Sequence, residues 1–412
     1  MRVLISAFTA HPRGSSEQGV GWNWSAQASR SHDVWVLTNR FHEADIRREL
    51  EEHPNPHLHF VFHSGPKEAT IWSAARKFHP IYYPAYLLWQ ATALDHARKL
   101  HEELHFDVTQ HLTWASHRFP SFLAWLDAPF VWGPIGGGES APSSLYRSLG
   151  SRFALGELSR DTSNRLVRVD PTVRHTADRA AKILTTSHET KAMLPGNAAS
   201  KAEVYPAIGL RLHDLDKEIE RTKPADHSNE ARLLFVGRLV AWKGCQFAIQ
   251  ALAKLRAAGR KATLTVVGMG PELKHLQALA AELGIAEHVE FRGNMPHEEV
   301  LQLCLSHDAF VFPSLHDSGG QAVLEAMYLG LPVVCLDLGG PALSVGDTGI
   351  RVACHSVEQI VEDLAGGVET ILSNPALRNE MISGARDRVI QMYDWDHKAE
   401  FIGRLYERAT DC

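Results

Sequence analysis

The stretch SLHDSGGQAVLEAMYLG, residues 314–330, indicates the fold of the second half of this chain. It follows the apolar run DAFVFPS, 308–314, which predicts a buried strand, and it contains a helix predicted over 320–329. A further apolar strand is predicted over 332–337. Strands that alternate with helices in this way form parallel sheets covered by helices, so the stretch predicts an α/β domain.

The polar residues of this stretch lie where the predicted strand passes into the predicted helix. Gly319 and Gly320 would let backbone N–H groups approach a phosphate at the helix N-terminus. Asp317 could accept hydrogen bonds from sugar hydroxyls, and Glu325 from the two hydroxyls of a ribose. The alternative is that Asp317 only caps the helix and that Glu325 faces solvent. The apolar neighbours of Glu325 favour a carboxylate with hydrogen-bond partners.

The same alternation of strands and helices extends through both halves of the chain. In the second half we predict further strands over 232–237, 262–268 and 288–293, and helices over 243–258, 271–283, 296–306 and 357–373. In the first half we predict strands over 2–8, 33–39, 106–112, 129–134 and 180–187, a loop over 11–22 and a helix over 22–30. A polar connector begins near residue 206. The pattern therefore predicts two Rossmann-like domains facing across a cleft, 1–205 and 206–389.

The composition is that of a soluble globular protein in a reducing compartment. A chain of 412 residues is too long for one ordinary core, and 44% hydrophobic with 22% charged residues is typical of globular proteins. The net charge of -6, without a long block of like charge, argues against a nucleic-acid partner. The five cysteines are scattered, and no apolar run suits a signal peptide or a membrane span. We therefore predict a cytoplasmic protein.

The 24 histidines raise the question of a metal site. They are dispersed along the chain, and neither an HExxH motif nor a Cys/His cluster organises them. The spacing of HLH, 57–59, is weak by itself. We therefore predict no metal site.

The segment FVGRLVAWKG, 235–244, places two cations in the loop after a predicted strand. Arg238 and Lys243 would lie at the carboxyl end of the sheet, where open α/β sheets bind ligands, with a helix beginning at about Lys243. Cations beside the N-terminus of a helix suit a diphosphate. The alternative is that both are ordinary solvated cations.

The segment VVGMGPEL, 266–273, is similar to the dinucleotide-binding motif GxGxxG, but Leu273 occupies the place of the third glycine. No acid ends a following strand at the spacing that the motif requires. The alternative is a tight turn between a strand and a helix. A nicotinamide oxidoreductase is therefore disfavoured.

Taken together, these segments resemble glycosyltransferase family 4, most strongly over about 232–345. The resemblance lies in FVGRLVAWKG, VVGMGPEL, VEFRGNMPHEEV and FVFPSLHDSGGQAVLEAMYLGLPVVCLDLGGP, and less distinctly in SSEQGVGWNW, SHDVWVLTN and WGPIGGGES. It implies a GT-B fold, a UDP- or GDP-linked sugar donor, and transfer with retention of anomeric configuration. It also implies no metal and no other cofactor, and a C-terminal helix at about 390–412 that returns to the first domain.

The resemblance also implies roles for individual residues. The catalytic residues that it implies, on the donor diphosphate and near the sugar hydroxyls, are Arg238, Lys243 and Asp317. The donor-binding residues that it implies, near the ribose, the phosphates and the base, are Glu325, Gly319, Gly320, Asn294, Met295, Gly19 and Gly21. His111 is implied on the acceptor side.

The chain departs from the family pattern at two places. Asp317 stands where the family usually has a glutamate, and Gly133 and Pro134 stand where many members have a histidine. The first departure shortens an acid by one methylene, and the second leaves no polar residue of the first domain assigned to the reacting centre.

The acceptor side is less well defined. The segment RKFHPIYYPAYLLWQ, 76–90, mixes aromatic residues with two cations and could contact a membrane surface, or it could pack on its own domain. We predict a retaining glycosyltransferase with a nucleotide-sugar donor and a glycan, lipid-linked or small-molecule acceptor. The alternatives are a nucleotide-sugar epimerase of similar double-Rossmann shape and a non-catalytic glycan- or nucleotide-binding protein.

Overall fold

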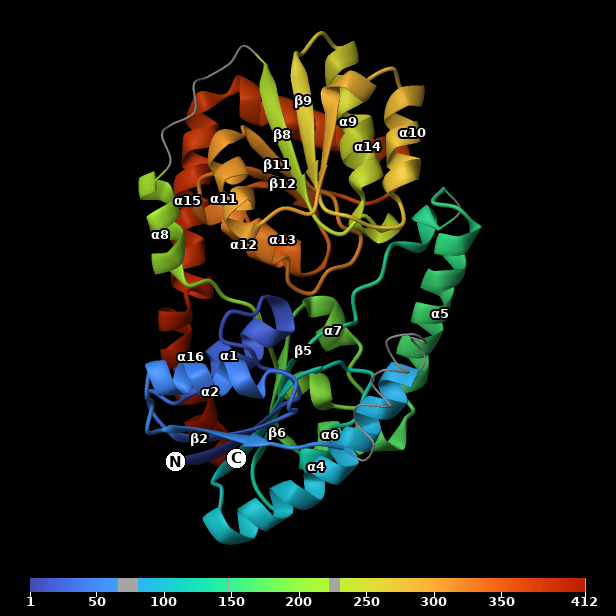
Figure 1. Ribbon diagram of the computed structural model, residues 1–412. Coiled ribbons are helices and arrows are strands. Elements are labelled where there is room, and N and C mark those ends of the chain that lie inside the picture. Colours follow the sequence, from blue (N-terminus) through green and yellow to red (C-terminus); the bar gives the residue numbers. More distant parts are fainter. Residues whose placement is uncertain (66–80, 147, 222–229, 412) are drawn as a thin grey trace. The chain divides into compact units, whose positions relative to one another are not determined.

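The computed structural model describes residues 1–65, 81–146, 148–221 and 230–411, which form two compact units (Figure 1). Unit 1 comprises Met1–Gly138, Ser163–Ile208 and Trp395–Cys412. Unit 2 comprises Glu139–Thr162 and Gly209–Asp394. Each unit contains one parallel β-sheet with helices on both of its faces, and each is described separately below.

Unit 1 is built on a seven-stranded parallel sheet in the order β3-β2-β1-β4-β5-β6-β7. Its strands are β1 (Arg2–Ala7), β2 (Asp33–Thr38), β3 (Leu58–Phe62), β4 (Val108–Thr113), β5 (Phe130–Ile135), β6 (Ala180–Thr185) and β7 (Ala202–Val204). Its helices are α1 (Ser16–Ala28), α2 (Glu43–Glu52), α4 (Tyr82–Leu104), α6 (Pro171–Arg179), α7 (His188–Ala192) and α16 (Trp395–Thr410). Helix α5 (Ser151–Val167) begins in unit 2 and ends in unit 1.

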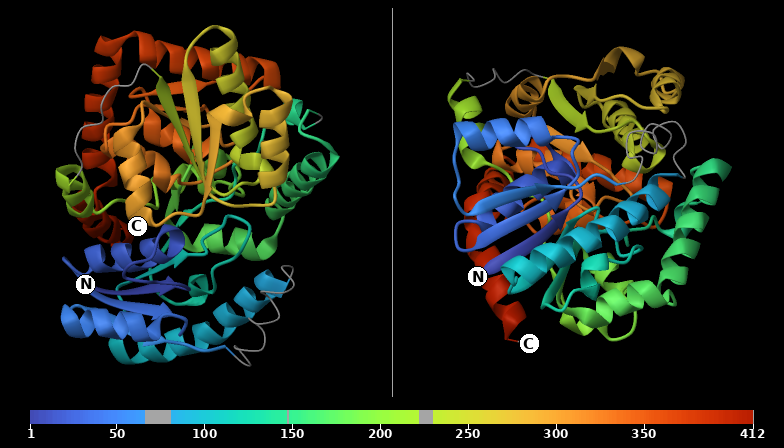
Figure 2. Two further views of the ribbon diagram at one scale, coloured as in Figure 1. Left: turned by 45° about the horizontal axis from the view of Figure 1, so that its top comes forward. Right: turned by 60° about the horizontal axis from the view of Figure 1, so that its bottom comes forward.

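The side chains of β1 show how this sheet is covered on both faces. Successive residues of a strand point to opposite faces. Val3 and Ile5 belong to the apolar cluster that α1 and α16 complete, whereas Leu4 belongs to the cluster of α4. In Figure 2, α4 (cyan) lies on the sheet in both views. The C-terminal helix α16 therefore joins unit 1 because its apolar face, which includes Ile402 and Tyr406, completes one of the two cores.

Unit 2 is built on a six-stranded parallel sheet in the order β10-β9-β8-β11-β12-β13. Its strands are β8 (Ala231–Val236), β9 (Ala262–Val267), β10 (Val289–Gly293), β11 (Ala309–Phe312), β12 (Val333–Leu336) and β13 (Ile350–Val352). Its helices are α8 (Leu212–Arg221), α9 (Cys245–Ala257), α10 (Leu273–Glu282), α11 (His297–Ser306), α12 (Gln321–Tyr328), α13 (Gly339–Val345), α14 (Val357–Ser373) and α15 (Pro375–Tyr393). Helix α9 packs against α10 and α14, and α12 packs against α11, α13 and α15.

The first six strands of each unit have the same order in the sheet, which confirms the predicted α/β class with two Rossmann-like domains. From one edge, each sheet runs third, second, first, fourth, fifth and sixth strand of its unit. The order reverses between β1 and β4 in unit 1 and between β8 and β11 in unit 2. At such a switch point the loops after the two strands diverge, and open α/β sheets bind their ligands there.

Helix α1 begins earlier than predicted. Residues 16–21 are helical rather than part of a loop, so Gly19 and Gly21 lie within α1. A Cβ atom at Gly21 would lie 2.1 Å from the carbonyl oxygen of Thr9, and one at Gly19 would lie 2.4 Å from that of Gly14. The two glycines were interpreted as loop residues, but they allow the helix to lie directly on the preceding backbone.

The segment Glu139–Thr162 belongs to unit 2, although the sequence analysis assigned it to the first domain. The reason is apolar packing. Ala141 and Leu145 are buried in the same cluster as Leu239 and Phe247 of unit 2. Burying these side chains stabilises the association of the segment with the C-terminal sheet.

Candidate functional site

The loops that follow β8 and β11 are in direct contact at the switch point of unit 2. The backbone N–H of Leu315 donates to the carbonyl oxygen of Trp242 at 2.8 Å. A Cβ atom at Gly244 would lie 1.9 Å from the carbonyl oxygen of Pro313, and Gly244 has a left-handed φ of +72°. Only glycine allows this approach, and Gly244 also separates the turn Ala241–Lys243 from α9. Helix α9 therefore begins at Cys245, after Lys243 rather than at it.

Two of the predicted catalytic residues form an ion pair across these loops. The Lys243 ammonium donates to a carboxylate oxygen, Oδ2, of Asp317. The two side chains are only 20% and 16% exposed, and the Lys243 nitrogen lies 5.3 Å from the centre of the Phe312 ring. The sequence analysis gave these residues separate ligands, a diphosphate and a sugar. The structure brings both groups to one point of the site.

Arg238, the third predicted catalytic residue, follows β8 and has an exposed side chain. Across the described parts of the chain, no carboxylate forms an ion pair with its guanidinium. A cation without a protein counter-charge at the carboxyl end of the sheet is available to an anionic ligand.

The two glycines predicted to approach a phosphate lie at the N-terminus of α12. Gly320 precedes the helix with a left-handed φ of +83°, and no side chain of the described residues caps this helix. The N–H of Gly319 lies 3.4 Å from Oδ1 of Asp317, while the carbonyl oxygen of Asp317 accepts from Gly340 at 2.8 Å. A helix N-terminus of this kind, preceded by a glycine in the left-handed region, is a favourable place for an anion.

Glu325 is buried on α12 and has hydrogen-bond partners, as its apolar neighbours indicated. Its oxygen Oε1 accepts from His297 Nε2 at 2.9 Å and from Gln321 Nε2 at 3.0 Å. Both donors bind the same oxygen, so within the described residues Oε2 has no hydrogen-bond donor. The hydrogen bond to Glu325 raises the pKa of His297, which lies at the start of α11. Oε2 of this carboxylate can accept from ligand hydroxyls while His297 and Gln321 hold Oε1 in place.

Asn294 and Met295 lie at the edge of the same set of loops. They follow β10, with Asn294 exposed and Met295 partly buried, and precede His297 by three and two positions. His297 bonds Glu325, the residue implied at the ribose. The segment of Asn294 and Met295, implied at the base, is therefore connected to Glu325 through His297.

The glycines of VVGMGPEL serve close packing. Cβ atoms at Gly268 and Gly270 would lie 2.0 Å and 2.1 Å from the carbonyl oxygens of Gly237 and Leu239. The backbone of the turn after β9 is therefore in close contact with the backbone of the loop that carries Arg238. The alternative that the sequence analysis gave for the incomplete dinucleotide motif, a tight turn between a strand and a helix, agrees with this turn between β9 and α10.

The predicted acceptor-side histidine is buried in unit 1. His111 on β4 is hydrogen-bonded at both ring nitrogens, to the Tyr86 hydroxyl at 3.0 Å and to the Ser121 hydroxyl at 2.8 Å. Burial lowers the pKa of His111 to about 4. The ring is therefore neutral near pH 7 and helps to hold α4 on the sheet. His111 belongs to unit 1, whereas the ion pair of Lys243 and Asp317 belongs to unit 2.

Sequence reasoning missed four residues beside the predicted ones: His297, His316, Trp242 and Glu157. His297 bonds Glu325, the ring of Trp242 stacks on His316 with centres 5.5 Å apart, and Glu157 bonds His316 at 3.0 Å. His297 and Trp242 stood inside quoted motifs without an assigned role. Glu157 had no sequence signal, because it lies 159 positions from its partner.

One group of side chains in the described residues has the spacing of a metal site: His11, His42 and Asp45 in unit 1. However, the N–H of Arg13 donates to Nδ1 of His11 at 3.0 Å, so the ring proton of a neutral His11 lies on Nε2, which faces Asp45 at 3.5 Å. Metal binding at Nε2 would move that proton to Nδ1, against the Arg13 N–H. In this arrangement His11 and Asp45 have the geometry of a His–Asp pair.

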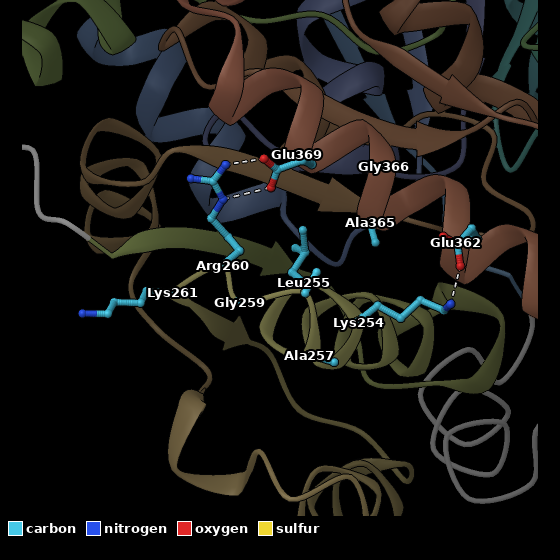
Figure 3. Close-up of a pocket in the computed structure, with 11 residues that line it drawn as sticks. Lys254, Leu255, Ala257, Gly259, Arg260, Lys261, Glu362, Ala365, Gly366 and Glu369 are labelled. Carbon is cyan, nitrogen blue, oxygen red and sulfur yellow. Dashed lines mark hydrogen bonds and ion pairs between the residues drawn. The ribbon is translucent and has the colours of Figure 1, made fainter.

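A hollow of about 1070 Å³ lies between the end of α9 and α14, and its lining side chains form ion pairs with one another (Figure 3). Arg260 pairs with Glu369, and Lys254 pairs with Glu362 across it. It adjoins Lys261, which precedes β9, and so lies at the end of the sheet opposite the loops described above. Two of its cations, Arg260 and Lys254, are thus neutralised by carboxylates of α14.

The described cysteines, Cys245, Cys304, Cys335 and Cys354, are free thiols. No helix in the described ranges has the length and hydropathy that a membrane crossing requires. The aromatic segment 76–90 lies only partly within the described residues. From residue 81 on, Tyr86 and Trp89 are core side chains, whereas Tyr83 and Leu88 are 51% and 41% exposed.

Comparison with solved structures identifies the class of fold. HepE from Anabaena, solved with UDP and glucose, aligns over 100% of this chain and 99% of its own, with a TM-score of 0.60 and 18% identity. Sucrose-phosphate synthase from Thermosynechococcus elongatus aligns over 99% and 98%, with a TM-score of 0.61 and 18% identity. The two Rossmann-like domains are those of GT-B glycosyltransferase structures.

Comparison of sequences finds similarity over the C-terminal part of the chain. Residues 216–388 match the family model of Glycosyl transferases group 1. The 2-deoxystreptamine glucosyltransferase of Streptomyces kanamyceticus is 29% identical over 238 residues, 56% of this chain and 61% of the relative. A glycogen synthase of Mycobacterium tuberculosis is 34% identical over 188 residues, 45% and 43% of the two chains. The chain thus spans less than two thirds of the length of these relatives.

Proposed function

We propose that this protein is a glycosyltransferase that moves a sugar from a nucleotide-sugar donor to an acceptor. The observation that supports it best is the row of groups along the carboxyl end of the unit 2 sheet. Lys243 and Asp317, the uncapped start of α12, and Glu325 follow one another there. The match of this region to glycosyltransferases and the UDP bound in HepE support the same function.

Each part of this row has a partner in a nucleotide sugar. The Glu325 carboxylate accepts from the ribose hydroxyls, and the segment of Asn294 and Met295 lies against the base. The amides after Gly319 and Gly320 bind the phosphates, together with Arg238 and Lys243. Asp317, beside Lys243, accepts from hydroxyls of the sugar. The donor is UDP- or GDP-linked.

Transfer proceeds with retention of anomeric configuration and without a metal. As the bond between the sugar and the diphosphate breaks, its electron pair and negative charge pass to the leaving phosphate. Arg238, Lys243 and the start of α12 stabilise this charge more strongly in the transition state than in the bound donor. The acceptor oxygen bonds the anomeric carbon on the same face, and the leaving phosphate takes its proton. No separate general base is then required.

The acceptor is a glycan, a lipid-linked glycan or a small molecule. Peripheral contact with the inner face of the membrane is part of the proposal, and in the described residues Tyr83 and Leu88 of α4 are the exposed side chains of the aromatic segment. Flotation of the full chain with anionic and neutral vesicles tests it. If the floating fraction holds the same amount of the chain with vesicles as without them, membrane contact is contradicted.

A panel of nucleotide sugars tests the donor and the reaction class together. Slow hydrolysis of one UDP- or GDP-sugar, with release of the nucleoside diphosphate and free sugar, is expected even without the acceptor. Conversion of the nucleotide sugar into an isomer with the diphosphate bond intact would instead indicate an epimerase. Binding of the nucleotide with no turnover of any sugar, with acceptors present, would indicate a non-catalytic protein.

A further inference from the structure

The segment Glu139–Thr162 places a buried acid against the loop between β11 and α12 of unit 2, residues 313–320. This loop, which carries Asp317, is called the donor loop below. The segment is closed on itself, since Arg160 donates to the carbonyl oxygen of Glu139 at 2.7 Å and the Tyr146 hydroxyl donates to Asp161 at 2.6 Å. Its apolar side chains are anchored in the core of the unit. It is thus a fixed element from which a side chain can hold a neighbouring loop.

Glu157 is the side chain of this segment that reaches the donor loop. It is 6% exposed, and both of its oxygens have partners: His316 Nε2 lies 3.0 Å from Oε1, and the N–H of Ala141 lies 3.2 Å from Oε2. Burial by itself would raise the pKa of Glu157, but the hydrogen bond and charge of His316, the Ala141 amide and the charge of Arg160 hold it below its usual value. A carboxylate kept ionised in a buried place needs partners of this kind.

His316 connects this acid to the proposed reacting groups. It immediately precedes Asp317, and because a carboxylate only accepts, the His316 ring nitrogen donates to Glu157. The face of the His316 ring stacks on Trp242, with an angle of 16° between the two ring planes. Trp242 immediately precedes Lys243. The Glu157–His316–Trp242 contacts therefore run beside the Asp317–Lys243 ion pair, one residue earlier on each loop.

We propose that Glu157 is a positioning residue for the transfer: through His316 it fixes the two loops so that Asp317 and Lys243 meet the donor in one geometry. This inference rests on the proposed function. Glu157 itself touches no proposed reacting atom. Its effect is to restrict the motion of the loop that carries Asp317. Small misplacements of groups that contact the substrate are costly in rate.

The test compares Glu157→Gln and Glu157→Ala with a control in the same segment, Asp161→Asn. The control removes one negative charge and weakens the Tyr146 bond without touching His316. We expect the Glu157→Ala variant to lose at least about tenfold in kcat for the nucleotide sugar that the wild type turns over, with UDP affinity within about twofold. Glu157→Gln keeps the volume and one acceptor for His316, so its kcat should lie between those of Glu157→Ala and the wild type. The control should keep its kcat.

A double-mutant cycle with Asp317 separates positioning from general loss of structure. In an Asp317→Asn background, Glu157→Ala should lower kcat by a smaller factor than in the wild-type background, because one of the two groups that it positions is already disabled. The same loss of kcat in both backgrounds would overturn the proposal. So would a control variant as impaired as Glu157→Ala.

Amide hydrogen exchange gives a readout that needs no substrate. In Glu157→Ala, but not in Asp161→Asn, the amides of Leu315 and Gly319 should exchange at least about tenfold faster. Unchanged exchange would overturn the proposal even if turnover fell. If the wild type turns over no nucleotide sugar, the proposed function fails by itself, and faster exchange would then still support the hold of Glu157 on the loop.

Discussion

Lys243 and Asp317, which lie 74 positions apart, form an ion pair at the point where the β8 and β11 loops meet. In the chain without ligand, the cation proposed for the diphosphate is thus already neutralised by the acid proposed for the sugar. A bound diphosphate has to share Lys243 with Asp317. This coupling makes the two residues distinguishable by experiment.

Asp317→Asn should therefore raise the affinity for UDP while it lowers transfer. Without the competing carboxylate, Lys243 is free for the diphosphate, and a gain of about 1 kcal/mol corresponds to about fivefold tighter binding. Transfer should fall at least about tenfold, because the sugar loses a charged hydrogen-bond acceptor. Calorimetry with UDP and rates of donor turnover check both parts. Weaker UDP binding in Asp317→Asn would contradict the competition.

Glu325→Gln should weaken UDP binding. A carboxylate that bridges two ribose hydroxyls makes charged hydrogen bonds of about 1.5–3 kcal/mol, and the amide keeps the shape but loses the charge. Calorimetry with UDP is again the measurement. If this variant binds UDP as tightly as the wild type, the ribose lies elsewhere.

Lys243→Ala and Arg238→Ala should impair turnover far more than folding. Loss of one charged contact that strengthens in the transition state costs about 3 kcal/mol, or about a hundredfold in rate. Lys254→Ala is a matched control, because Lys254 is also an ion-paired lysine of unit 2 but lies in the hollow at the opposite end of the sheet (Figure 3). Rates for Lys243→Ala and Arg238→Ala that match the Lys254→Ala rate would remove both residues from the mechanism.

The pKa of His297 should exceed the ordinary value of a histidine side chain and should drop in Glu325→Gln. The hydrogen bond to Glu325 raises this pKa, so the interaction stabilises the fold fully below the imidazole pKa of the unfolded chain. That stabilisation is lost as the pH rises through the higher pKa of the folded chain. Titration of the histidine ring signals by NMR in the two proteins checks the shift. An equal His297 pKa in both would show that Glu325 does not hold this ring.

Activity should survive chelation. The proposed mechanism stabilises the leaving diphosphate with Arg238, Lys243 and the start of α12, so treatment with EDTA should change the rate of donor turnover by less than about twofold. Abolition of turnover by EDTA, with recovery on adding back one divalent ion, would show that a metal takes part and would reopen the role of His11, His42 and Asp45.

Part of the fold could be predicted because apolar strands and amphipathic helices are local patterns. Helix α14 was predicted with its observed bounds, β11 lies within the strand predicted over 308–314, and α12 lies within the helix predicted over 320–329. The helical residues 16–21 were missed, because two glycines usually indicate a loop. Only the packing of α1 on Thr9 and Gly14 shows why glycines are required inside that helix.

The sequence by itself determined the class of fold and the loops that hold the candidate site. In a parallel α/β sheet all strand-to-helix loops meet at one edge, so the order of strands and helices is enough to place Lys243, Asp317 and Glu325 there. The tertiary structure alone decided how these residues are paired. Glu157 and His316 meet across 159 positions, and His297 bonds Glu325 from a different helix. Such pairs depend on how helices and loops pack in three dimensions, which no local pattern of residues records.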